Sequence, residues 1–204
     1  MTPDVIRRLT ARGAFIAALA LVLGLSVQLR LLRAAYADLE KRLREPHAGM
    51  YVPTVKAGGL PSDSVVLADT VPGRRQLLFI FTTECPYCRA SIPAWIRLAA
   101  AAESLTSPRV TVVGITLSAL DSTRVFAAQH QLTFQVVRFP ERKLVYIYKA
   151  QTVPVTMVLD TPGRVLYAHT GQVINAAVED SVLAALRFEP APSVQRTASP
   201  GRRP

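Results

Sequence analysis

Hydrophobic positions follow one another without a charged residue between Gly13 and Leu29, near the start of the chain. A helix needs about 20 such residues to cross the hydrocarbon layer of a membrane, and two further leucines after Arg30 supply the missing length. The guanidinium of an arginine at a helix end can extend to the lipid headgroups. The pattern therefore predicts a basic tail over residues 1–12 and a transmembrane anchor over residues 13–32 that contacts membrane lipid.

Beyond this span, hydrophobic residues recur at alternating steps of four and three positions. They are Leu25, Leu29, Leu32, Tyr36, Leu39 and Leu43. This spacing places them on one face of a helix that leaves the membrane, and Pro46 and Gly49 are expected to end it. We predict an amphipathic neck helix over residues 33–49. A second copy of the chain can pack on the stripe, so residues 25–43 are the candidate surface for a weak dimer.

From residue 50 to residue 188 the pattern alternates between strands and helices. Runs typical of strands lie at 77–81, 109–116, 134–137, 155–159 and 164–169. Helical patterns lie between 89 and 105, near 121–131, in the polar stretch before 149 and near 174–187. The turn-forming sequence Asp160-Thr161-Pro162-Gly163 separates the last two strands. This order predicts an α/β domain in which helices flank a central mixed sheet.

Composition supports a single globular domain with attachments, because the chain has 204 residues and half of them are hydrophobic. The tail over residues 189–204 has four prolines and no hydrophobic periodicity, so we predict that it is disordered.

The formal net charge of +10 is spread along the chain. No stretch gathers Lys and Arg with interleaved aromatic residues, so we expect no nucleic-acid binding; the basicity instead favours an anionic membrane surface.

The chain has two cysteines, Cys85 and Cys88, in one Cys-Pro-Tyr-Cys sequence between the 77–81 strand and the next helical pattern. A disulfide that closes so short a loop adds little stability, so redox chemistry is the favoured purpose. A cysteine at the first turn of a helix faces unpaired N–H groups and the positive end of the helix dipole, which favours the thiolate. Cys85 is therefore the expected attacking sulfur and Cys88 the resolving sulfur. Pro86 suits the first helical position, and Tyr87 is expected to be exposed.

Several other features accompany the cysteine pair: Pro93 five residues after it, Val153-Pro154 before a strand, and Gly171 after the last strand pair. Together with the strand that leads into the cysteines, they make residues 50–188 resemble the thioredoxin superfamily. Within it, the chain is similar to the membrane-anchored, extracytoplasmic thiol-disulfide oxidoreductases of the TlpA and ResA type. The resemblance implies a thioredoxin-like fold, and the long stretch between Cys88 and Pro154 resembles the central insertion of that subgroup.

The resemblance also implies roles for these residues. Pro93 would bend the helix that carries the cysteines. The Val153–Pro154 bond would be cis beside the cysteine pair, and the backbone of Val153 would pair with the substrate as an added strand. The implied function is the exchange of disulfides with cysteine-containing protein substrates, and we expect it to need no cofactor and no metal.

The same resemblance implies a place in the cell: the inner (cytoplasmic) membrane, with the catalytic domain on the periplasmic side. There the enzyme would meet newly exported cysteine proteins or apocytochromes, as in cytochrome c maturation, and would exchange electrons with a membrane redox donor or acceptor. Basic residues flank the span on both sides, however, and the positive-inside count alone would place the domain inside. A cleaved signal peptide is the alternative to an anchor. Ala35-Tyr36-Ala37 offers a cleavage site, although Arg30 and Arg33 separate it from the hydrophobic run.

Two positions depart from the resembled proteins. Glu84 precedes the first cysteine, where the family often has Trp, and Phe79 stands where thioredoxin has a buried acid, so the usual proton acceptor is absent. Glu84 can either act as the base for Cys88 or be an exposed loop carboxylate whose charge opposes thiolate formation at Cys85. Arg89 would offset that charge.

Three alternatives remain for the cysteine pair. Half of a zinc site would need two further ligands from His47, His130 and His169, none of which has ligand spacing. A thiol peroxidase is suggested by Thr82, three residues before the first cysteine as in the Thr-x-x-Cys arrangement of peroxiredoxins, although Leu78 occupies the place of the expected proline. A non-catalytic docking module would use the fold as a binding surface, and its cysteines would be incidental.

Overall fold

The computed structural model describes residues 3–60 and 64–187, with side chains described from Leu19 onward. Residue contacts divide the chain into two units, residues 1–45 and residues 46–204. The tail that we predict to be disordered, residues 189–204, lies outside the described residues.

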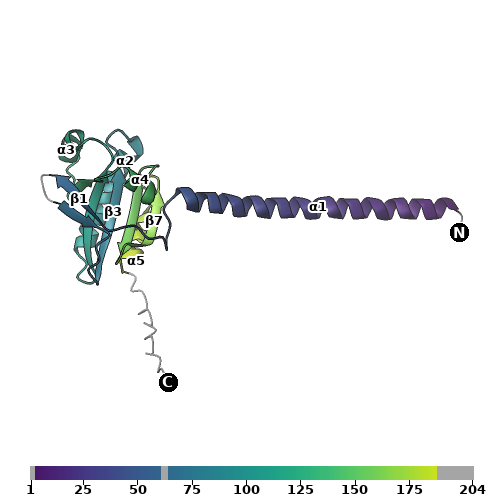
Figure 1. Ribbon diagram of the computed structural model, residues 1–204. Coiled ribbons are helices and arrows are strands. Elements are labelled where there is room, and N and C mark those ends of the chain that lie inside the picture. Colours follow the sequence, from purple (N-terminus) through teal and green to yellow (C-terminus); the bar gives the residue numbers. More distant parts are fainter. Residues whose placement is uncertain (1–2, 61–63, 188–204) are drawn as a thin grey trace, which may run out of the picture. The chain divides into compact units, whose positions relative to one another are not determined.

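The first unit is a single helix, α1, which extends from Pro3 to Arg44 (Figure 1). Its segment Leu19–Arg44 is long and hydrophobic enough to cross a membrane, and none of it is buried within the protein. A membrane anchor and a signal sequence both fit this description. The helix ends at Arg44, before the predicted end of the neck at residue 49, because Pro46 lacks the N–H group that a further turn needs.

Seven strands of the described residues form one mixed sheet in the second unit (Figure 1). They are β1 (Val55–Leu60), β2 (Ser64–Leu67), β3 (Arg74–Phe81), β4 (Arg109–Thr116), β5 (Gln135–Arg138), β6 (Val155–Asp160) and β7 (Arg164–Thr170). Their order is β2-β1-β5-β4-β3-β6-β7. Strands β3, β4 and β5 are parallel, and the other neighbouring pairs are antiparallel. The predicted α/β class with a central mixed sheet is confirmed.

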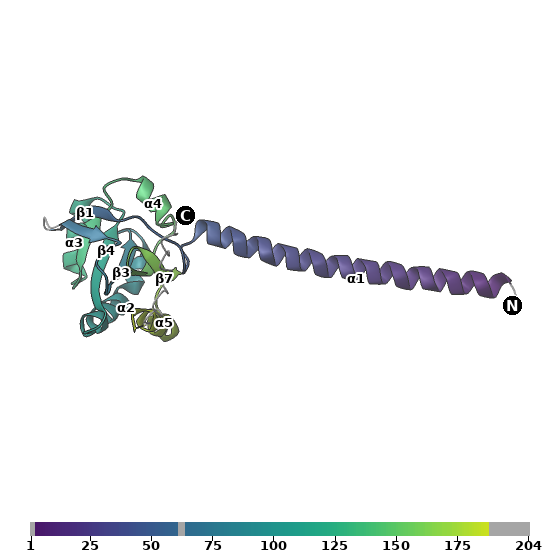
Figure 2. The ribbon, with the colours of Figure 1, turned by 60° about the horizontal axis from the view of Figure 1, so that its bottom comes forward.

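Helices cover both faces of this sheet (Figure 2). They are α2 (Pro86–Glu103), α3 (Leu120–Gln129), α4 (Lys143–Ile147) and α5 (Ala176–Arg187). Strand β3 shows how its alternating side chains divide between the faces. Leu77, Phe79 and Phe81 enter a core shared with α2, α3 and α5, whereas Leu78 and Ile80 enter a second core shared with α4. Helix α4 is only five residues long, so most of the polar stretch that we expected to be helical forms loops.

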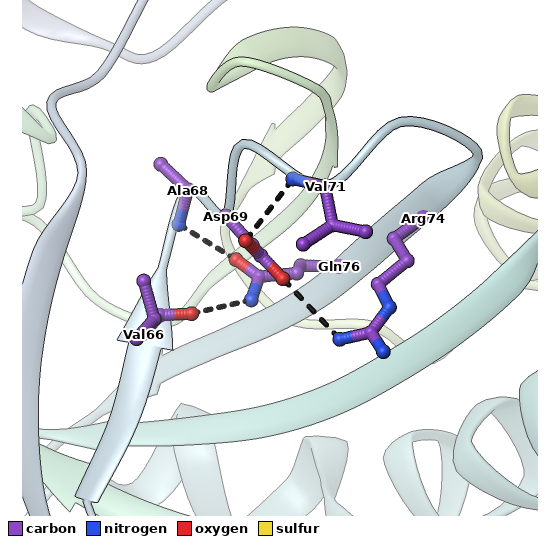
Figure 3. Close-up of polar contacts among 6 residues, drawn as sticks. All are labelled: Val66, Ala68, Asp69, Val71, Arg74 and Gln76. Atoms are coloured by element: carbon purple, nitrogen blue, oxygen red, sulfur yellow. Dashed lines mark hydrogen bonds and ion pairs between the residues drawn. The ribbon is translucent and has the colours of Figure 1, made fainter.

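Gln76, a buried polar residue on β3, holds the segment around the end of β2 (Figure 3). Its side-chain oxygen accepts a hydrogen bond from the Ala68 N–H, and its amide nitrogen donates to the Val66 carbonyl, both over 2.7 Å. Asp69, in the following turn, forms the other contacts drawn in Figure 3. Because the oxygen and the nitrogen of the buried amide each have a partner, these hydrogen bonds offset the cost of removing the amide from water and tie this segment to β3.

The carboxyl ends of the three parallel strands lie at one edge of the sheet. Phe81 at the end of β3 is opposite Thr116 at the end of β4, and Thr116 is opposite Arg138 at the end of β5. The loops that leave these three residues are therefore neighbours. Because the first loop leads to Cys85, this edge of the sheet holds the candidate site.

Candidate active site

Cys85 occupies the N-cap of α2, with φ −74° and ψ 117°, and Pro86 begins the helix. The Cys88 N–H donates a hydrogen bond to the Cys85 sulfur over 3.2 Å, so this sulfur satisfies one of the free N–H groups of the first turn. Both cysteines are free thiols, and the Cys85 side chain is half-buried. Tyr87 is exposed and Pro93 lies inside the same helix, as the sequence predicted. A sulfur that meets solvent at a helix start is placed to act as a nucleophile.

Cys88, one turn further along α2, is fully buried. Burial raises the pKa of Cys88 from the ordinary value of 9.0 to about 12, and the hydrogen bond with the Cys85 side chain is the second-largest cause of this increase. A hydrogen bond with the Thr82 backbone acts in the opposite direction. Cys88 is therefore a protonated thiol at neutral pH. The two cysteines differ in exposure in the way that an attacking and a resolving sulfur require.

The loop before β6 lies against the cysteine pair. The Val153–Pro154 bond is cis, as predicted. The Cys85 sulfur is 3.9 Å from the Val153 carbonyl oxygen, a distance typical of a weak hydrogen bond from a thiol. The Pro154 carbonyl accepts a hydrogen bond from the Gly171 N–H over 2.8 Å. The fold thus brings together Val153, Pro154 and Gly171, which are far from the cysteines in the sequence.

Buried polar side chains hold α2 in place against the sheet. The hydroxyl of the fully buried Ser91 donates to the Tyr87 carbonyl over 2.8 Å and accepts from the Val173 N–H over 3.0 Å. The indole N–H of Trp95 donates to the hydroxyl of Thr156 on β6 over 3.1 Å. These contacts fix the helix that carries both cysteines relative to the cis-proline loop. Sequence analysis missed Ser91 and Thr156, because neither belongs to a recognisable motif.

Glu84, which precedes the first cysteine, is an exposed carboxylate on the loop. It accepts hydrogen bonds from the Thr83 hydroxyl over 2.6 Å and from the Ser118 hydroxyl over 2.9 Å. Both hydrogen bonds lower the pKa of Glu84, and the bond from Thr83 has the larger effect. The Glu84 carboxylate is therefore ionised at neutral pH. Of the two interpretations of Glu84, the structure supports the exposed loop carboxylate rather than a base for the buried thiol.

Ser118 joins the loops that leave β3 and β4. Its hydroxyl accepts a hydrogen bond from the Thr83 N–H over 3.0 Å, and its own N–H donates to the Thr116 hydroxyl over 3.2 Å. Beside it, the Leu117 N–H donates to the Phe81 carbonyl over 2.9 Å. Sequence analysis missed this link, because it depends on which residues of β3 and β4 lie opposite each other.

The surroundings of the cysteine pair contain neither a metal cluster nor a buried acid. Among the described residues, no group of three or more His, Cys, Asp and Glu side chains is suited to hold a metal ion. In the same part of the chain no Asp or Glu is buried. Phe79, where thioredoxin has an acid, instead stacks on Trp95 with ring centroids 5.0 Å apart. Within the part of the chain that the structure describes, the buried thiol therefore has no carboxylate in the core to accept its proton.

Comparisons with known proteins give a family and a fold. The sequence model of the redoxin family matches residues 47–186. No curated protein sequence matches the chain. A Chlorobium tepidum protein assigned as the thiol:disulfide interchange protein DsbE is 26% identical, with a TM-score of 0.60 over 70% of this chain and 99% of that chain. StoA from Bacillus subtilis is 19% identical, with a TM-score of 0.54 over 64% and 98% of the two chains. A secreted disulfide oxidoreductase of Mycobacterium tuberculosis is 21% identical, with a TM-score of 0.52 over 71% and 98%.

The fold and the cysteine pair define the class of this protein: it is a thioredoxin-fold thiol-disulfide oxidoreductase. Because the family model covers well over half of its length, the chain belongs to the redoxin family. The family resemblance predicted from the cysteines and Pro154 is confirmed at this level.

Proposed function

We propose that the protein exchanges disulfides with protein substrates through Cys85 and Cys88. The observation that carries this proposal is the half-buried Cys85 sulfur at the start of α2, 3.2 Å from the backbone nitrogen of its buried partner. In reduction, the Cys85 thiolate attacks one sulfur of the substrate disulfide, that S–S bond breaks, and the first substrate thiolate leaves. Cys88 then loses its proton and attacks the Cys85 sulfur, which releases the second substrate thiol. Two electrons pass from the dithiol to the substrate, and the reverse sequence oxidises a substrate dithiol.

The resolving step requires Cys88 to give up a proton from a buried position. Its pKa of about 12 makes this unfavourable in the free dithiol. No Asp or Glu is buried among the described residues, so the proton must pass to another acceptor. The substrate thiolate that leaves Cys85 is the base generated at the right place and time. We infer that Cys88 is deprotonated as that thiolate departs, so Cys88 itself stays unreactive until Cys85 has formed the mixed disulfide.

The backbone of Val153 is the proposed contact for the substrate chain. Its carbonyl lies 3.9 Å from the Cys85 sulfur, so an extended substrate segment that pairs with Val153 would present its own disulfide to that sulfur. Pro154 and Gly171 support this loop through their own hydrogen bond of 2.8 Å. Pro86, Tyr87 and Glu84 border the same sulfur and would tune its reactivity.

We further propose that residues 13–32 anchor the protein in the inner membrane, with the catalytic domain in the periplasm. The substrates there would be exported cysteine proteins, including apocytochromes, and a membrane redox partner would supply or accept the electrons. The hydrophobic stripe within residues 25–43 is exposed along α1, and ion pairs Arg42–Asp38 and Arg44–Glu40, both 2.9 Å long, lie in its last turns. This arrangement supports a neck in water that pairs weakly with a second copy of the chain.

A single-turnover experiment tests the exchange reaction. The reduced full-length chain is mixed with a peptide that contains one disulfide, and the released peptide thiols are counted. The wild-type dithiol should release both thiols of the peptide, Cys88→Ser should stop at a mixed disulfide after releasing one, and Cys85→Ser should release none. Reduction by Cys85→Ser at the wild-type rate would eliminate the proposal. Rapid peroxide consumption without peptide reduction would instead favour a thiol peroxidase.

A further inference from the structure

A pocket with a volume of about 570 Å³ lies at the carboxyl edge of the parallel strands. Thr116 and Leu117 from the end of β4 form one wall, and Arg142 and Val145 around α4 form another. Arg138, at the end of β5 and opposite Thr116 in the sheet, also lines the pocket. The pocket is distinct from the cysteine pair, and nothing in the exchange reaction described above uses it.

The pocket carries positive charge. Arg138 and Arg142 are both exposed, and neither guanidinium forms an ion pair or hydrogen bond with another residue of the described chain. Glu141, between them in the sequence, is paired with Lys143 over 2.6 Å, so it does not neutralise the two arginines. Glu84, on the loop that leaves β3, has its oxygens bonded to the Thr83 and Ser118 hydroxyls. Two guanidinium groups with no partner among the described residues are well suited to bind a carboxylate.

Hydrophobic side chains form the rest of the lining. Phe139 is buried, with its ring centroid 4.9 Å from that of Tyr148, and Leu117 and Val145 pack against the same core. Such walls can contact the methylene groups of an acidic side chain while its carboxylate meets the arginines. They also exclude water from one side of the contact, which strengthens the attraction between opposite charges.

The walls of the pocket continue into the active site. Leu117 is bonded through its N–H to the end of β3, and the next residue, Ser118, binds the loop that carries the cysteines. On the α4 side of the pocket, Val145 accepts a backbone hydrogen bond from Ala150 over 2.7 Å, and the chain then leads directly to Val153. Val145 and Val153 pack against one shared core. A substrate segment that pairs with Val153 therefore has this pocket beside it.

We propose that Arg138 and Arg142 form a docking subsite for an acidic side chain of the substrate polypeptide, close in sequence to the cysteine under attack. The proposal rests on the disulfide exchange proposed above and adds a preference among substrates. Asp or Glu near the reacting disulfide speeds capture by Cys85, because the guanidinium groups hold the segment while the sulfurs meet. The same residues would repel a basic segment.

The test compares three peptides that share one disulfide and differ in the flanking residue, which is Glu, Gln or Lys. Reduced full-length protein is mixed with each peptide, and the second-order rate constant of thiol release is measured at low and high salt. The variant Arg138→Gln/Arg142→Gln removes the subsite. Arg109→Gln/Arg187→Gln removes the same charge from exposed residues at the start of β4 and the end of α5, away from the pocket, and is the matched control.

The wild type and the control should react about tenfold faster with the Glu peptide than with the Gln peptide, and high salt should reduce this ratio. In the double pocket variant the ratio should fall to about one, while the rate with the Gln peptide stays unchanged. Equal rates with the three peptides in the wild type would overturn the subsite, even though disulfide exchange itself stands. The subsite would also be overturned if the rate constant of the double pocket variant fell by the same factor with every peptide. In another outcome, the wild type shows no preference for the Glu peptide, and inorganic phosphate slows its reaction with all three peptides equally but does not affect the pocket variant. This result would assign the arginines to a small free anion and contradict docking. No reaction with any peptide would instead count against the exchange function.

Discussion

The buried resolving cysteine should resist alkylation in the folded protein, and the single-cysteine variant Cys85→Ser isolates this effect because Cys88 is then the only thiol in the chain. Only thiolates react with iodoacetamide at appreciable rates. A thiol with the ordinary pKa of 9.0 is about one-tenth ionised at about pH 8, whereas one with a pKa of about 12 is about one ten-thousandth ionised. The difference is about a thousandfold in rate. The variant also loses the hydrogen bond between the cysteines, but burial, the larger cause, remains, so we expect a rate at least about a hundredfold below that of an ordinary thiol.

The measurement is the rate of mass gain on alkylation at a series of pH values, for the folded variant and for the same variant unfolded in guanidinium chloride. Because burial raises the pKa of Cys88, the folded rate should keep increasing about tenfold for each pH unit beyond pH 9, where the unfolded rate levels off. The reasoning is refuted if the folded protein reacts within about tenfold of the unfolded rate near pH 8, or if both rates level off at the same pH.

Three further changes test the packing around the site. Gly163→Ala should lower the free energy of unfolding by about 3 kcal/mol, because φ is +79° there and the new Cβ would meet a backbone carbonyl. The control Gly49→Ala, at φ +90° with open space around the new Cβ, should lower it by only about 1 kcal/mol. Equal losses for the two variants in denaturant titrations would contradict this reasoning. Thr156→Val should lower the free energy of unfolding by about 1 to 3 kcal/mol, because it leaves the buried indole N–H of Trp95 without an acceptor. In a double-mutant cycle, the same change should cost less once Trp95 is replaced by Phe, which has no N–H to leave unpaired. Glu84→Gln should speed alkylation of the exposed cysteine about twofold at low salt and less at high salt, because a negative charge beside the thiolate is removed; a slower reaction would show that the carboxylate assists it.

Local sequence patterns were sufficient for elements whose residues have a strong preference of their own. Strand β4 has the predicted limits, Arg109–Thr116, because its β-branched residues favour a strand and the two cores under the helices bury its last five residues. The sequence pattern did not identify β1, Val55–Leu60, as a strand of its own. It contains Gly58 and Gly59, and its strand structure depends on pairing with β2 and β5, which no local pattern reveals.

The candidate site was predictable to a similar degree. Cys85 and Cys88 follow from a short sequence with a known physical meaning, whereas the cis bond before Pro154 was implied by the family resemblance. The contact of Glu84 with Ser118, and the pocket that Arg138 and Arg142 line, depend on strand order and register, which bring three separate loops to one edge of the sheet. Such juxtapositions arise from the tertiary fold, so residue types and spacing alone did not indicate them.

Trapping of the reaction intermediate tests the assignment of the two sulfurs most directly. With Cys88→Ala in the full-length chain, the first attack can occur but the second cannot, so mixed disulfides with substrate proteins should accumulate in cells and should disappear on treatment with a reductant. Every such adduct should be linked through Cys85 when the joined peptides are sequenced by mass spectrometry, and Cys85→Ala should form none. Adducts at equal levels in both variants, or no adducts in either, would contradict an attacking sulfur at Cys85.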